Sequence, residues 1–227
     1  AAANVGARQV VKDLISLKVN VNAVNENNQN AIHHAVIGNN SYDFSFRFET
    51  IKSKIIQDLV NANANISLCE ESGATPLIYA IQANYKEIFD TLITLGANVN
   101  GFDSNDTLPL YYALLVKESY FVNLLYKTNR LEVNKVNKFN YTVLHQLLSI
   151  NFHPVVFEHI LKTLIDIGFD INYHKDIEPP LLMYVKSMQF ISERSVGFVQ
   201  NKKTVSETEQ KIAKLFVKFN ADVMLCL

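Results

Sequence analysis

The sequence predicts an all-α solenoid of helix–turn–helix units joined by β-turn fingers. A short string ending in Val or Ile closes each successive apolar stretch, and most stretches hold two short amphipathic helical patterns. The marker residues are Val21, Ile66, Val99, Val133, Ile171 and Val223, with gaps of 45, 33, 34, 38 and 52 residues. A base period of 33 residues indicates stacked units that bury their apolar faces against their neighbours.

The clearest unit covers residues 68–100 and contains the string GATPLIYA. Thr75 can cap a helix by accepting a hydrogen bond from a free N–H group, and Pro76 suits the first helical position. Leu92 belongs to the apolar stripe of a second helix. Gly96 can adopt the left-handed conformation that ends this second helix.

Weaker copies of the same string recur along the chain. They are NQNAIHHA at 28–35, DTLPLYYA at 106–113, NYTVLHQL at 140–147 and IEPPLLMY at 177–184. Together these strings resemble the G-x-T-P-L-H-x-A pattern of the ankyrin-repeat family. The resemblance covers nearly the whole chain, and it implies a concave face made of first helices and fingers.

The markers divide the chain into a partial unit and five further units. Their ranges are 1–23 (partial), 24–67, 68–100, 101–134, 135–172 and 173–227, the last being divergent. The start within a helical pattern and the end within a finger predict a piece of a longer protein or an irregular last unit.

Two units carry extra residues between their helices, at 39–50 and at about 187–207. The first insertion alternates aromatic and polar residues with a strand-like period of two, through Tyr42, Phe44, Phe46 and Phe48. Two roles are compatible with this pattern. The aromatic residues either cover exposed helix ends or form a docking element.

The turn of each finger needs a residue that tolerates positive φ. Gly73 meets this need in the clearest unit, and Asn28, Asp106 and Asn140 meet it in three others. Ile177 stands at the same place in the last unit, and a β-branched residue does not suit positive φ. We therefore expect an altered turn there.

The sequence predicts neither an enzyme nor a cofactor site. It contains no glycine-rich phosphate loop and no nucleophile elbow, and no metal-ligand spacing can be built from its six histidines. His33 and His145 occupy the histidine position of the repeat, where the resemblance implies hydrogen bonds between neighbouring turns. A net charge of −1 predicts no direct nucleic-acid binding.

Cys69 and Cys226 are the two cysteines of the chain, fewer than a secreted disulfide scaffold uses. Free thiols predict an intracellular location, in the cytoplasm or alternatively the nucleus. No apolar run is long enough to cross a membrane, so direct membrane insertion is not expected.

Candidate binding residues lie where the resemblance implies variable, exposed side chains. An apolar and aromatic patch is expected from two consecutive units, with an acidic edge beside it. The patch residues are Phe102, Leu115, Val116, Phe139, Tyr141 and Ile150, and the edge residues are Glu70 and Glu71. The alternative is that these side chains turn inward and belong to the core.

The resemblance predicts a non-enzymatic module that binds a protein or an extended peptide on its concave face, as an adaptor or scaffold does. One alternative is a scaffold segment of a larger enzyme, channel or trafficking protein. Another is a regulator that masks a transcription factor. Fold analogy alone does not choose between them.

Overall fold

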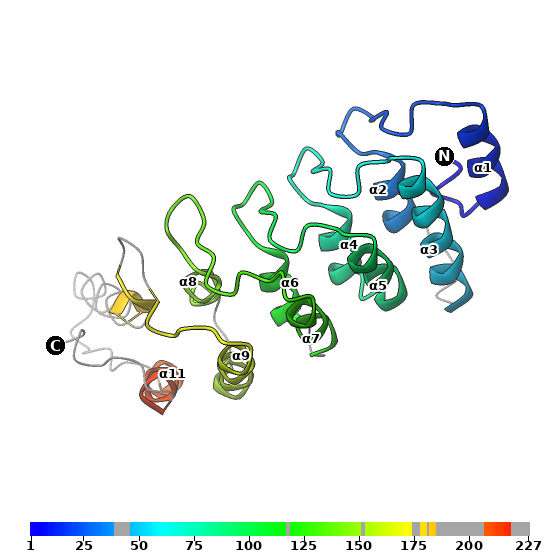
Figure 1. The fold of residues 1–227 in the computed structure, drawn as a ribbon. Helices are drawn as coiled ribbons and strands as arrows, with labels where there is room; N and C mark the ends of the chain where they lie inside the picture. The colour runs from blue at the N-terminus through cyan, green and yellow to red at the C-terminus, as the bar shows by residue number, and fades with distance from the viewer. Residues whose placement is uncertain are drawn as a thin grey trace, which may run out of the picture. The chain divides into compact units, whose positions relative to one another are not determined.

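Figure 1 shows the computed structural model, which describes residues 1–38, 46–116, 119–150, 153–173, 178–180, 182–184 and 207–218. The described residues form helices and loops, with no strand among them. This result confirms the predicted all-α solenoid class. The chain divides into two compact units, Ala1–Leu131 and Glu132–Leu227.

The helices of the first unit form two rows. One row, called the first-helix row below, consists of α2, α4 and α6, which contact one another in this order. The second-helix row consists of α1, α3, α5 and α7, which also contact one another in this order (Figure 1). The bounds are α1 Arg8–Ser16, α2 Ala31–Ile37, α3 Phe46–Asn61, α4 Pro76–Gln82, α5 Lys86–Thr94, α6 Pro109–Leu115 and α7 Tyr120–Lys127.

The second unit contains α8 (Val143–Leu147), α9 (Pro154–Asp166) and α11 (Glu207–Lys218). Helices α9 and α11 pack together, and the ring centroids of Phe157 and Phe216 are 5.9 Å apart. The aromatic pair gives these two helices a shared apolar core.

The pair α4–α5 confirms the local predictions for residues 68–100. Thr75 Oγ1 accepts a hydrogen bond from Ile78 N at 3.3 Å, and Pro76 occupies the first turn. Gly96 has φ +90° just after α5, as expected for a left-handed helix end.

The apolar faces of these helices are buried between neighbouring repeats of the first unit. Leu92 and Phe89 of α5 are both fully buried, and Phe89 meets Phe121 of α7 edge-to-face with centroids 4.9 Å apart. Helix α5 also packs on α3 and α4. The core of the first unit is therefore shared between successive repeats rather than enclosed within one repeat.

Polar side chains after the Val/Ile markers hold the next marker segment by hydrogen bonds. Asn22 Oδ1 accepts from Asn65 N at 2.6 Å, and Ser67 Oγ accepts from Asn98 N at 2.9 Å. In the second unit Asn134 Oδ1 accepts from Asp170 N at 3.0 Å. These bonds fix the register between successive repeats.

The histidines of the repeat string connect neighbouring turns, as predicted. His33 is fully buried, with Nδ1 accepting from Asn30 N at 3.3 Å and Nε2 donating to Ala74 O at 3.4 Å. His145 repeats this arrangement by donating from Nε2 to Glu178 O at 3.0 Å. Burial lowers the pKa of His33, so the ring stays neutral and keeps one donor and one acceptor.

The strand-like period of the first insertion does not correspond to a strand where the structure describes it. Helix α3 begins at Phe46, so Phe46 and Phe48 are helical, and residues 46–50 belong to the helix rather than the insertion. A local pattern is a weak guide to secondary structure because tertiary context overrides local preference. Tyr42 and Phe44 lie outside the described residues, as do 187–206 of the second insertion.

Lys52 of α3 is fully buried. Its Nζ donates to Ala3 O at 2.8 Å and to Asn4 O, and it lies 4.8 Å from the ring centroid of Phe48. Burial lowers the pKa of Lys52 to about 8, because removing water disfavours the ammonium form.

We expect Leu92→Ala to lower the free energy of unfolding by about 2–5 kcal/mol, because the leucine is fully buried and leaves a cavity. Urea titration followed by circular dichroism measures this loss. Thr94→Ala, at an exposed position of the same helix, is the control and should change little. An unchanged midpoint for Leu92→Ala would contradict the shared core.

We expect the free energy of unfolding to rise with pH above about 8, by up to about 3 kcal/mol from Lys52. Below pH 8 both states carry the proton and the fold bears the full cost of a buried charge. Between 8 and 10.5 the unfolded chain binds the proton and the folded chain releases it, which favours folding.

The measurement is urea unfolding at intervals from about pH 7.5 to about pH 9.5. Lys52→Met should flatten the slope, whereas Lys54→Met, at an exposed neighbouring position, should keep it. The same slope in Lys52→Met as in the unaltered chain would show that another group causes it.

Candidate functional site

Four loops of the described chain, called fingers below, share one closed backbone geometry. They are residues 25–29, 70–74, 103–107 and 137–141, and in each the first N–H donates to the fifth carbonyl at 3.0–3.1 Å. The fourth residue has positive φ in all of them, at Asn28, Gly73, Asp106 and Asn140, which confirms the turn prediction. Ile177 lies outside the described residues.

In three fingers the first side chain closes the loop a second time. Oδ1 of Asn25, Asp103 and Asn137 accepts hydrogen bonds from the N–H groups of the third and fifth finger residues, at 2.8–3.1 Å. A finger fixed in this way loses little conformational entropy when a partner binds.

The fingers of the first unit are also bonded to one another. Glu71 N donates to Asn27 O at 2.9 Å, and Ser104 N donates to Ser72 O at 3.1 Å. Asn28 Nδ2 adds a bond to Cys69 O at 2.6 Å. The three fingers therefore form a continuous hydrogen-bonded row.

Glu70 does not form the exposed acidic edge that the sequence suggested. Its side chain is buried, with 9% of its surface exposed, and its carboxylate accepts from Gln29 Nε2 at 2.5 Å and from Ser72 Oγ. Burial would raise its pKa, but hydrogen bonds from Ser72, Gln29 and Tyr79 outweigh it and lower the pKa. Glu71 is exposed, so one predicted edge residue is accessible.

A link between three of the four fingers and the helix behind each of them was missed by the sequence interpretation. The partners are nine residues apart: Asn25 and His34 at 3.4 Å, Glu70 and Tyr79, and Asp103 and Tyr112 at 2.5 Å. Burial and then the bond to Glu70 raise the pKa of Tyr79 to about 12, so its hydroxyl remains a donor. The constant spacing of polar pairs was the available sequence signal.

The first unit holds three of the six predicted patch residues. Leu115 ends α6 and is 41% exposed, so its side chain is not in the core. Val116 follows as the helix cap, and Phe102 precedes the finger 103–107; both are half-buried. Of these three side chains, Leu115 is the most exposed, so it agrees best with the predicted accessible apolar group.

The second unit holds the other three. Phe139 is 59% exposed at the third position of its finger, and Lys138 Nζ lies 5.1 Å from its ring centroid. Tyr141 is half-buried and stacks on His145 with centroids 5.6 Å apart and planes 13° apart. Ile150 is half-buried. A single patch formed by all six residues stays a prediction.

The described ranges meet the requirements of neither a metal site nor a membrane-spanning helix. No group of three or more His, Cys, Asp or Glu side chains in them could hold a metal ion. Among the same residues, no helix combines the length and the apolar composition that a membrane span requires.

Comparison with known proteins identifies the repeat. A family model described as ankyrin repeats (3 copies) matches residues 47–135. The putative ankyrin repeat protein FPV223 of Fowlpox virus is 33% identical over 127 residues, which cover 56% of this chain and 84% of that protein. The chain belongs to the ankyrin-repeat family. Ankyrin repeats are in general protein–protein interaction modules.

Further similarities extend this picture without adding an activity. Poly [ADP-ribose] polymerase tankyrase of Caenorhabditis elegans is 28% identical over 159 residues. The match covers 59% of this chain but only 7% of the length of tankyrase. The solved ankyrin repeat protein EF0377 has a TM-score of 0.66 and 18% identity, covering 96% of each chain. This structural likeness shows the shared fold alone.

We expect Gly73→Ala to destabilise the first unit more than Gly96→Ala. Both glycines have positive φ, which costs an alanine about 1–2 kcal/mol. A Cβ at Gly73 would also lie 2.0 Å from Ser104 N, whereas a Cβ at Gly96 meets nothing within 4 Å.

Urea midpoints of the two variants give the comparison, and amide exchange at Ser104 reports on the bond between fingers. Faster exchange is expected only for Gly73→Ala, since the clash must separate neighbouring fingers. Equal losses of stability would contradict the close approach of the two loops.

Proposed function

We propose that the chain binds a protein or an extended peptide through its fingers and the ends of its first helices. The observation that carries this proposal is an exposed apolar side chain on a rigid support in each unit. Leu115 ends a helix of the first-helix row, and Phe139 sits on a doubly closed finger.

The energetics favour binding at these two positions. Covering a large apolar side chain contributes on the order of 1.5–3 kcal/mol before the costs of association. Because the fingers are already closed by hydrogen bonds, little of this gain is lost in ordering them. The same two units also contain half-buried apolar or aromatic side chains, namely Phe102, Val116, Tyr141 and Ile150.

Surface charge contributes less to the choice of partner than the two apolar anchors do. Glu71 is exposed on a finger of the first unit, so it favours a basic flank of the partner, mainly through the association rate. Glu70 is excluded from this role because its carboxylate is buried and hydrogen-bonded.

A second candidate is a scaffold segment of a larger enzyme. The match to 7% of the length of tankyrase supports this candidate, since ankyrin repeats there belong to a much longer chain. The mass of the native protein tests it, and a mass equal to that of this chain alone would overturn it. An intracellular location stays a prediction.

The test of binding pairs two double variants. Leu115→Ala with Phe139→Ala removes both anchors, and Tyr126→Ala with Val155→Ala removes similarly exposed apolar side chains from second helices. A ligand is first selected on the unaltered chain from a displayed peptide library. We expect the first pair to weaken its binding at least about tenfold and the second to leave it unchanged.

Isothermal titration gives the affinities, and circular dichroism confirms that both variants fold. Unchanged affinity for the anchor variant, or an equal loss for the control variant, would contradict the proposed face. Because all four side chains are substantially exposed, neither variant should melt the protein.

A further inference from the structure

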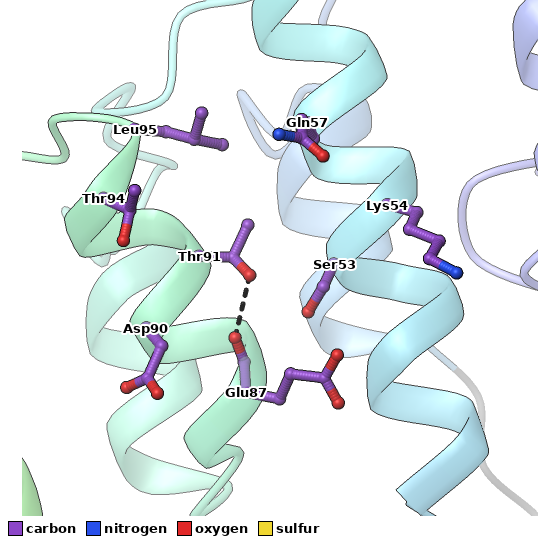
Figure 2. A pocket seen from close by; sticks show the side chains of 8 residues that line it. All are labelled: Ser53, Lys54, Gln57, Glu87, Asp90, Thr91, Thr94 and Leu95. Carbon is purple, nitrogen blue, oxygen red and sulfur yellow. Dashed lines mark hydrogen bonds between the residues drawn. The ribbon is translucent and has the colours of Figure 1, made fainter.

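A groove lined mostly by polar residue types lies between α3 and α5 in the second-helix row, apart from the fingers (Figure 2). Its volume is about 290 Å3, close to the lower limit for small-ligand pockets. One wall includes Ser53 and Lys54 of α3, and the other includes Glu87, Asp90 and Thr91 of α5, with Leu95 at its end. This size suits a single side chain.

Ser53 provides the first observation that points to a ligand. Its side chain is buried, with 6% exposed, and its Oγ is the one buried side-chain nitrogen or oxygen of the described residues without a hydrogen-bond partner. A helical hydroxyl usually bonds to the carbonyl of the preceding turn, as Thr91 does to Glu87 O at 2.9 Å. Figure 2 shows Ser53 directed into the space between the helices.

Carboxylates around the groove provide a second, independent observation. Glu87 Oε2 accepts from Thr50 Oγ1 at 2.8 Å, and both oxygens of Asp90 lie 2.6 Å from Tyr120 Oη. Glu49 Oε2 accepts from Glu87 N at 2.9 Å, which adds a third carboxylate nearby. Neutral donors hold these groups in place without cancelling their charge.

Two described lysines have side chains close to this groove. Neither Glu87 nor Asp90 forms an ion pair with any described side chain. Lys54 is exposed, and Figure 2 shows it directed away from α5. Lys86 Nζ lies over the ring of Tyr120, 5.3 Å from its centroid.

We propose that this groove binds an arginine side chain of a protein partner. A guanidinium is a planar cation with five N–H donors, so it can donate to Ser53 Oγ and to the Glu87 carboxylate at the same time. Its methylene stem can pack on Leu95. A lysine ammonium has its three donors on one atom, so it reaches two separate acceptors less well.

This site goes beyond the binding face proposed above. It uses second helices instead of first helices and fingers, and it stands whether or not the fingers bind a partner. A partner that engages both faces would combine apolar anchors with one buried charge.

The test is an NMR titration of the chain with N-acetyl-arginine amide, compared with the lysine analogue. We expect shifts confined to amides of α3 and α5, with the lysine analogue binding several-fold more weakly. Ser53→Ala and Glu87→Gln should each weaken arginine binding at least about tenfold, because each removes a hydrogen bond to a charged group. Glu26→Gln, at an exposed finger position, is the matched control and should have no effect.

Ser53→Ala also separates binding from a structural role. Without ligand its melting temperature should equal or exceed that of the unaltered chain, because an unpaired buried hydroxyl is lost. A clear drop in melting temperature would overturn the proposal. Shifts that both variants leave unchanged, no shifts in α3 and α5, or equal binding of the lysine analogue would also overturn it.

Discussion

The whole structure depends on burial between neighbouring repeats. Helices as short as α4 or α6 are too short to be stable alone, and their apolar faces are covered only by the helices of adjacent repeats. Phe89 and Phe121 illustrate this, since each is fully buried only through contact across a repeat boundary. The stacking of repeats also brings the three fingers of the first unit next to one another.

Polar contacts then set the register that apolar packing leaves loose. Hydrophobic contact is non-directional, whereas a bond such as Asn22 to Asn65 or His33 to Ala74 has one geometry. Such bonds recur between the successive repeats that are described within each unit. These contacts also align the fingers, so that Ser104 N can donate a hydrogen bond to Ser72 O.

Much of this architecture follows from the sequence, because it depends on local rules. Helix starts at Thr75 and Pro76, positive φ at Asn28 and Asp106, and the role of His33 each follow from residue type and repeat position. The burial of Glu70, the helical start at Phe46 and the unpaired hydroxyl of Ser53 do not. Each depends on which side chains a neighbouring repeat supplies, and no local pattern encodes that.

The double closure of the fingers has a consequence for how such a protein can change over generations. The backbone is fixed by the first, fourth and fifth finger residues, through hydrogen bonds and positive φ. Of the second and third residues, such as Lys138 and Phe139, only the third takes part in that closure, through its N–H group. Substitutions of the second and third side chains therefore leave this closure intact. The tips can acquire new binding partners while the fold that presents them stays the same.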